Sequence, residues 1–103
     1  MVKQVHSVDE FKGLLGDKRL VVVDFYATWC GPCKMIAPKL EEWSQNEPNV
    51  LFVKVDVDEV EELAAEYGVS AMPTLMFFKN GIKVEEIVGA NLDKICEAIQ
   101  KNK

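Results

Sequence analysis

Three runs of β-branched and aromatic residues constrain the fold of this chain more than any other feature. They cover Leu20 to Ala27, Val50 to Val55 and Thr74 to Phe78. The first run has little polar alternation, which is typical of a strand covered on both faces, and the other two predict further long strands. All three are far shorter than the roughly 20 apolar residues that span a bilayer, so we expect no transmembrane helix.

The segments between these runs show the 3.6-residue period of helices. Pro32 suits the first turn of one of them, because no amide hydrogen is needed there. In that helix the apolar residues Met35, Ile36, Leu40 and Trp43 follow a helical stripe. Helices are predicted over about residues 8–15, 32–45, 59–67 and 92–99.

Polar residues mark where several elements begin or turn. Ser7, followed by Glu10 three residues later, has the spacing of a capping box, in which each side chain satisfies a free amide. Asn91 is placed to cap the last helix. Asn80 and Gly81 both tolerate a positive φ, which predicts a two-residue hairpin and an antiparallel return strand at about residues 83–88.

With a short strand at residues 2–5, the element order becomes β-α-β-α-β-α-β-β-α. Right-handed crossovers between the early strands and a hairpin at the end give an α/β fold, a mixed five-stranded sheet flanked by four helices. The chain has 103 residues, 49% of them apolar, and no repeat, low-complexity tract or linker. We therefore expect a single domain over residues 1–103, acting as a monomer.

The charge and the cysteine content restrict the possible functions. A net charge of −5 gives no electrostatic reason to bind nucleic acid or an anionic membrane surface. The N-terminus shows no long apolar signal region, so we expect a cytoplasmic protein, although a processed organelle protein would look the same. Three cysteines are too few for a disulfide framework, and a Cys-x-x-Cys pair indicates metal binding or redox chemistry.

The pair is Cys30 and Cys33, at the point where a buried strand turns into a helix. Open α/β sheets bind and react at this end of their strands. A spacing of three residues brings both sulfurs to one side of the first helical turn, close enough for a disulfide. The partial positive charge of the helix N-terminus stabilises an anion, so we expect Cys30 to be the nucleophile that attacks a substrate disulfide. Cys33 would then resolve the mixed disulfide, with no metal or cofactor.

A zinc site is the alternative interpretation of the same pair. Zinc normally takes four ligands, and the chain offers only Cys96 and His6 in addition. Cys96 lies on the apolar stripe of the last helix, where a small core residue is expected. His6 is explained as an ordinary surface or strand-end residue. The strand-to-helix context of the pair therefore favours redox chemistry.

Four groups of residues together resemble the thioredoxin family, and the match extends over essentially the whole chain. They are Val23-Asp24-Phe25, Trp29-Cys30-Gly31-Pro32-Cys33-Lys34, Met72-Pro73-Thr74 and Val88-Gly89. The resemblance implies the thioredoxin fold and a general protein-disulfide reductase that serves in electron transport and cell redox homeostasis. It also implies disulfide-containing proteins as substrates, a thioredoxin reductase as electron donor, and no cofactor beyond the cysteine pair.

The resemblance further implies a cis peptide bond between Met72 and Pro73, and a Met72 backbone that pairs with a bound substrate strand. Gly31 and Pro32 support the redox pair, and Gly89 permits a close approach of backbone. Taken alone, the apolar members of this surface are equally consistent with core packing. The implied apolar docking rim consists of Trp29, Met72, Pro73, Val88, Gly89 and Ala90.

Asp24 stands in a buried strand, where a carboxylate is costly unless it is protonated, hydrated or paired. Desolvation is expected to raise its pKa. The resemblance implies that Asp24 takes and returns the proton of Cys33 through water, with Lys54 on the neighbouring strand as its charge partner. The residues alone leave open a solvated strand-end aspartate and an ordinary surface lysine.

Two features depart from the family pattern, and two other functions remain open. Tyr26 stands where some relatives have a second tryptophan, and Cys96 is an additional cysteine. An oxidase or isomerase on the same fold is the nearest competing function, although Gly31-Pro32 resembles the reducing members. A binding module whose cysteines only report redox state is the other.

Overall fold

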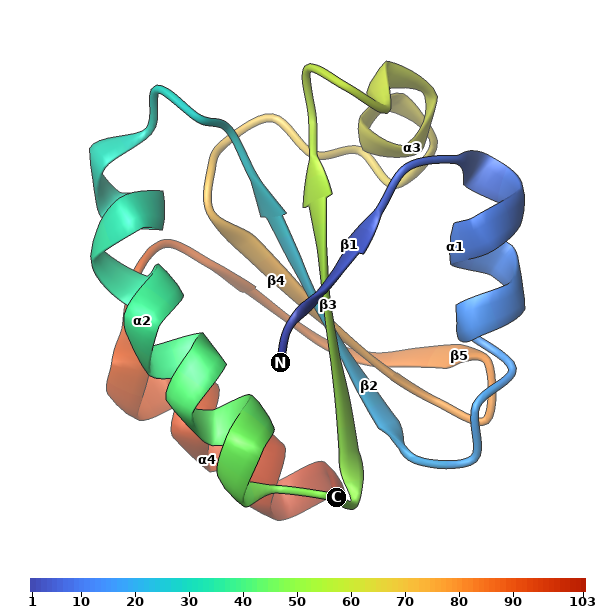
Figure 1. Cartoon of the computed structure of the whole chain (residues 1–103), viewed down its shortest axis with the longest axis vertical. Helices are drawn as coiled ribbons and strands as arrows, with labels where there is room; N and C mark the ends of the chain where they lie inside the picture. Colours follow the sequence, from blue (N-terminus) through green and yellow to red (C-terminus); the bar gives the residue numbers. More distant parts are fainter.

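A five-stranded sheet runs through the middle of the molecule between two pairs of helices in the computed structural model, which describes residues 1–103 (Figure 1). The strands are β1 (Lys3–Val5), β2 (Leu20–Tyr26), β3 (Val50–Asp56), β4 (Thr74–Lys79) and β5 (Ile82–Val88). The helices are α1 (Val8–Leu14), α2 (Gly31–Asn46), α3 (Glu61–Glu66) and α4 (Leu92–Asn102). This arrangement confirms the predicted α/β class and element order. None of the four helices is both long and apolar enough to cross a membrane.

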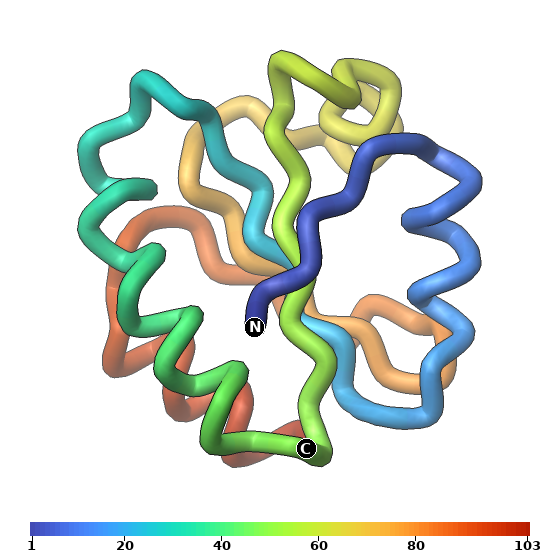
Figure 2. The backbone as a smooth tube through the Cα atoms, viewed as in Figure 1, coloured from blue at the N-terminus to red at the C-terminus, as the bar shows by residue number.

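The strands lie in the order β1-β3-β2-β4-β5. β1 and β2 both pair with β3 in parallel, and the backbone trace shows β1 and β3 running side by side (Figure 2). β4 is antiparallel to β2, and β5 is antiparallel to β4. The carboxyl ends of the three parallel strands therefore meet at one edge of the sheet, where the chain leaves β2 for α2.

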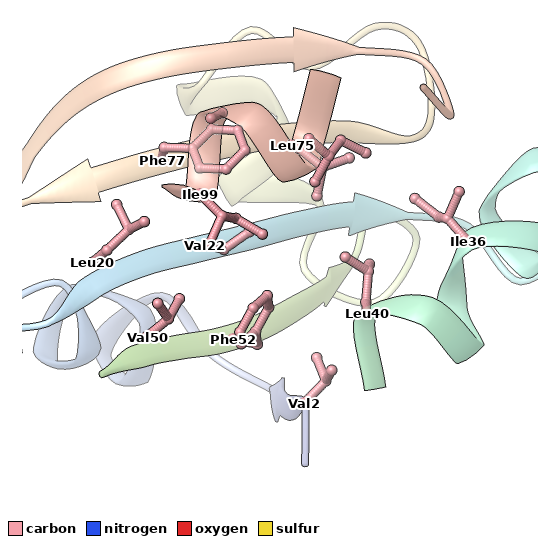
Figure 3. Close-up of a cluster of buried hydrophobic side chains, with 12 residues drawn as sticks. Val2, Leu20, Val22, Ile36, Leu40, Val50, Phe52, Leu75, Phe77 and Ile99 are labelled. Carbon is pink, nitrogen blue, oxygen red and sulfur yellow. The ribbon is translucent and has the colours of Figure 1, made fainter. Parts of the chain in front are cut away.

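Helices α2 and α4 cover one face of the sheet, and α1 and α3 cover the other (Figure 1). Side chains of the first face interdigitate with Ile36 and Leu40 of α2 and with Ile99 of α4 (Figure 3). We call this the α2/α4 layer; its buried members are Val2, Leu20, Val22, Ile36, Leu40, Val50, Phe52, Leu75, Phe77, Ile95, Ala98 and Ile99. The opposite α1/α3 layer buries Val5, Phe11, Leu15, Val21, Val23, Phe25, Val53, Val55, Val60, Leu63, Met76 and Phe78.

Most of the predicted turn and cap signals are confirmed. Asn80 and Gly81 both have a positive φ, of 54° and 78°, and connect β4 to β5. Ser7 accepts a hydrogen bond from the backbone N–H of Glu10, as expected of an N-cap. The Glu10 side chain accepts from the N–H of His6 rather than from that of Ser7, so the predicted capping box closes one residue earlier.

The predicted apolar stripe of α2 is wrong at Met35, whose side chain is 75% exposed. Successive residues of an α-helix are about 100° apart around its axis, and the stripe is centred on Ile36 and Leu40, which are both buried. Trp43 returns to that side after two turns, whereas Met35 lies beyond its edge. Met35 therefore faces solvent, two residues after Cys33.

Candidate active site

The two predicted redox cysteines begin α2 and are joined by a disulfide. Cys30 is the N-cap residue, with an extended backbone, and Pro32 stands in the first turn, where it gives up no helical hydrogen bond. Cys33 lies inside that turn, and the two Cα atoms are 5.3 Å apart. The strand-to-helix turn thus places the pair as predicted from the sequence.

The surroundings of the Cys30 sulfur favour negative charge on it. The backbone N–H of Cys33 donates a hydrogen bond to Cys30 Sγ at 3.1 Å, and the first turn of α2 has no acidic residue. The N-terminal dipole of a helix stabilises an anion at this position. The carbonyl oxygen of Met72 lies 3.6 Å from the same sulfur. Cys30 and Cys33 are only 5% and 3% exposed, so the solvent reaches the pair through a small opening.

A partly apolar surface surrounds that opening. Trp29 is 66% exposed, and its indole N–H donates to Asp58 Oδ2 at 3.0 Å. Met72 is half-buried and packs against the small cluster formed by Ala27 and the two cysteines, and the Met72–Pro73 bond is cis, as the resemblance implied. Val88 at the end of β5 is exposed. These residues leave apolar surface open beside a buried sulfur.

Gly89 and Ala90 follow β5 and differ in their surroundings. The N–H of Gly89 donates to the carbonyl of Pro73 at 2.8 Å, which joins the end of β5 to the cis-proline loop. Gly89 has a φ of 106°, a conformation that an L side chain rarely adopts, and a Cβ placed there would meet no neighbour. Ala90 is half-buried and packs against the α2/α4 layer.

Asp24 lies in the middle of the sheet, on β2, and is only 5% exposed. One of its carboxylate oxygens, Oδ1, is buried with no hydrogen-bond partner. Burial raises its pKa to about 7, against the opposing effect of the positive charge of Lys54. Lys54 is its register neighbour on β3, but the two side chains form no salt bridge within 4.0 Å. The carboxyl group can therefore gain or lose a proton near neutral pH.

A cavity of about 310 Å³ joins Asp24 to Cys33. This volume is large enough for several water molecules, each of which occupies about 30 Å³ in the liquid. Besides these two residues the cavity is lined by Tyr26, Ala27, Thr28, Lys34, Ala37 and Lys54. A larger hollow of about 640 Å³, between the start of α1 and the start of α3, is lined by His6 and mostly acidic residues and contains neither cysteine. Of these two hollows, only the smaller one is lined by a redox cysteine.

Two contacts of the site were not predicted from the sequence. The first is the hydrogen bond from the Trp29 indole to Asp58, which could have been considered because Asp58 follows β3 at the edge where the parallel strands end. The hydrogen bond from the Tyr26 hydroxyl to Gln4 Oε1, at 3.0 Å, spans three strands and has no local sequence signal.

Comparison with known proteins identifies the family. The thioredoxin family model matches residues 2–101. The chain belongs to the thioredoxin family. It is 56% identical over 102 residues to thioredoxin-1 of Schizosaccharomyces pombe and 53% identical over 102 residues to thioredoxin-1 of Saccharomyces cerevisiae. Each alignment covers 99% of this chain and 99% of the relative. The crystal structure of Fasciola hepatica thioredoxin matches with a TM-score of 0.96 at 45% identity, over 99% of this chain and all of that one.

Membership decides between the functions that the sequence left open. Thioredoxins are thiol-disulfide oxidoreductases that reduce disulfide-containing proteins, and thioredoxin reductases regenerate them. They work with their own cysteines and no cofactor. This chain is accordingly a protein-disulfide reductase, and Cys30 and Cys33 are its redox pair.

Proposed function

We propose that Cys30 is the attacking residue and Cys33 the resolving residue of this reductase. The observation that carries this order is the hydrogen bond from the Cys33 N–H to Cys30 Sγ at the N-terminus of α2, which stabilises a thiolate on Cys30. The Cys30 thiolate attacks one sulfur of a substrate disulfide, and the other substrate sulfur leaves as a thiolate that takes up a proton.

The second step transfers the disulfide to this chain. Cys33 loses its proton and attacks Cys30 Sγ in the mixed disulfide, which releases the second substrate sulfur. The substrate gains two electrons and two protons, and Cys30–Cys33 becomes the oxidised pair. Intramolecular attack from within the same helical turn is faster than attack by a dissolved thiol, since its effective concentration is many orders of magnitude higher.

Asp24 is the proposed acceptor of the Cys33 proton. Its raised pKa and the cavity that it shares with Cys33 support transfer through water. Lys54 lines the same cavity and tunes the charge on the carboxyl group. Asp24 returns the proton when the pair is reduced again.

The proposed substrate-binding surface is the rim around Cys30. The exposed faces of Trp29 and Val88 offer apolar contact, and the Met72 backbone beside the sulfur is available for pairing with an extended segment. Gly31 and Pro32 shape the turn that presents the pair. The proposed rim comprises Trp29, Met72, Pro73, Val88, Gly89 and Ala90.

The cellular setting completes the proposal. Residues 1–103 act as one domain and as a monomer in the cytoplasm, where the chain carries electrons from a thioredoxin reductase to disulfide-bearing proteins. It binds neither nucleic acid nor membranes. Sedimentation, cell fractionation and NADPH-coupled reduction of insulin with purified thioredoxin reductases test these points in turn.

Two single substitutions test the order of attack. Cys30→Ser should abolish both the acceleration of insulin reduction by dithiothreitol and the turnover driven by the reductase, because the thiol that attacks the substrate disulfide is gone. Cys33→Ser should instead accumulate mixed disulfides through Cys30, visible by mass spectrometry. Cys96→Ser is the matched control and should leave turnover unchanged. Retained turnover in either active-site variant, or mixed disulfides trapped through Cys33, would contradict the proposal.

A further inference from the structure

A polar row crosses the sheet beneath the active site. Gln4, Lys54 and Asp24 occupy matching positions on β1, β3 and β2. Tyr26 lies two residues beyond Asp24, and since side chains of a strand alternate, both project from the same face. Its hydroxyl donates to Gln4 Oε1, two strands away, so the Tyr26 side chain passes over β3.

Lys54 makes no salt bridge although a buried carboxylate is its direct neighbour. Its ammonium lies 5.9 Å from the centroid of the Tyr26 ring, in the range of a cation–π contact. The neighbouring Asp24 leaves Oδ1 without a hydrogen-bond partner. All three side chains line the 310 Å³ cavity that reaches Cys33. A cation and an anion thus share one cavity unpaired, with an anchored aromatic ring beside the cation.

We propose that Tyr26, anchored by Gln4, is a positioning residue that holds Lys54 away from Asp24 and thereby keeps the carboxyl group able to exchange protons at neutral pH. The functional half of this inference rests on the proposed role of Asp24. The structural half, the placement of Lys54, does not.

The reason lies in what a direct ion pair would do. A lysine in contact with Asp24 would stabilise the carboxylate and lower its pKa, by about 1–3 units for an opposite charge within about 4–6 Å. A carboxylate with a low pKa is a weak base and would take the Cys33 proton less readily. Burial also raises the pKa of the Tyr26 hydroxyl, which stays protonated and able to donate to Gln4.

Other charged groups near this row have to be held constant in any test. Facing Asp24 across the cavity are Cys33 and Lys34 from α2, whereas its β4 neighbour Leu75 carries no charge. Asp56 and Glu59 act on the Tyr26 hydroxyl. On the side of Lys54 that faces β1, the neighbouring hollow is lined by Lys3, His6 and Glu10. None of these residues is changed in the variants below.

The direct measurement is the titration of the Asp24 carboxyl carbon by NMR in the reduced protein. Tyr26→Leu removes the ring and frees Lys54 to approach Asp24, so the pKa of Asp24 should fall by about half a unit or more. Tyr26→Phe and Gln4→Leu both keep the ring and remove the anchoring hydrogen bond, so each should give a smaller fall in the same direction.

Loss of the ring also lets more water reach Asp24, which lowers its pKa without involving Lys54. Repeating the titrations with Lys54→Met separates the two effects, because hydration acts in both backgrounds and the lysine in only one. A fall that is larger when Lys54 is present supports the proposal. Equal falls in both backgrounds, or no fall in either, would overturn it.

The rate at which Cys33 resolves a mixed disulfide, followed against pH, tests the functional half. In Tyr26→Leu the rise of this rate with pH should move to lower pH by the same amount as the Asp24 titration, with a lower plateau. If the titration moves and the rate profile does not, Tyr26 still positions Lys54 as proposed, and it is the proton-acceptor role of Asp24 that fails.

Discussion

The two layers of the molecule are built from the same strands, and only the face that carries the α2/α4 layer holds a buried carboxyl group. In β2, Val21, Val23 and Phe25 enter the α1/α3 layer, and the alternate residues enter the α2/α4 layer. The twelve buried hydrophobic members of the α1/α3 layer include Phe11, whose ring lies 5.4 Å from that of Tyr67 and 6.2 Å from those of Phe25 and Phe78. Along β2 toward α2, the other face carries the buried carboxyl group of Asp24.

From this difference we expect the face under α1 and α3 to contribute mainly to stability, and the face under α2 and α4 to contribute to reactivity as well. An apolar residue at position 24 would extend the α2/α4 layer without an orphaned polar atom. The chain instead keeps a group whose burial is unfavourable when it is charged. The α1/α3 layer contains no such exception, so we expect it to contribute to folding and nothing to the redox step.

The largest effect is expected for Phe11→Ala in the α1/α3 layer. Removing this fully buried ring should lower the free energy of unfolding by about 3–5 kcal/mol, measured by urea titration at pH 7. The rate of mixed-disulfide resolution, measured under conditions where the variant is folded, should stay within twofold of the parent. A parallel loss of rate and stability would break the proposed division between the layers.

Asp24→Asn should act in the opposite direction on stability. The pKa of Asp24 rises from its ordinary 3.8 to about 7 on folding, so the folded state binds more protons in that window. The parent therefore loses stability as pH rises from about 4 to about 7, by about 4 kcal/mol at about 1.36 kcal/mol per unit. The variant should gain up to this amount at pH 8 and little at pH 4, while resolution slows.

Asp58→Asn provides the control for charge, because it removes the same single negative charge at an exposed position. It should leave the pH dependence of unfolding unchanged. If Asp24→Asn were no more stable than the parent at pH 8, the raised pKa of Asp24 would be refuted. If its resolution rate were also unchanged at pH 7, Asp24 would have no part in the mechanism.

The smallest effect concerns the contact between the β3–α3 loop and Trp29 of the rim. Asp58→Ala removes the acceptor of the Trp29 indole, a hydrogen bond worth about 1 kcal/mol. The KM for a protein disulfide should rise by up to about fivefold, with kcat little changed. Asp58→Asn keeps an acceptor oxygen and should behave like the parent. An unchanged KM in Asp58→Ala would show that indole orientation does not contribute to binding.

Short-range signals in the sequence predicted most of the fold. The hairpin at Asn80-Gly81 and the caps at Ser7 and Asn91 depend on residues within three positions of each other, and the structure confirms them. The prediction for Met35 was wrong because the pattern of apolar residues on a helix does not show where the buried stripe ends. The Glu10 carboxylate accepts from the N–H of His6 instead of that of Ser7, because adjacent free amides compete for the same carboxylate.

The site was predictable only in part, for a related reason. The redox turn is a contiguous motif, so Cys30 and Cys33 could be placed from spacing alone. The cavity beneath them depends on how α2 sits over β2 and β3, and no local pattern states which side chains will leave space. Asp24 was recognised as unusual, but the separation of Lys54 from it depends on Tyr26 and Gln4, which are 22 residues apart in sequence.

The near-complete burial of Cys30 limits how a substrate disulfide can approach it. Only 5% of the residue is exposed, and the Met72 carbonyl lies beside its sulfur. We therefore expect a disulfide on a loop or an unravelled strand to reach this sulfur more readily than one held in the flat surface of a rigid protein. On that expectation, the chain reduces partners that are already locally unfolded and leaves the disulfides of well-folded proteins intact.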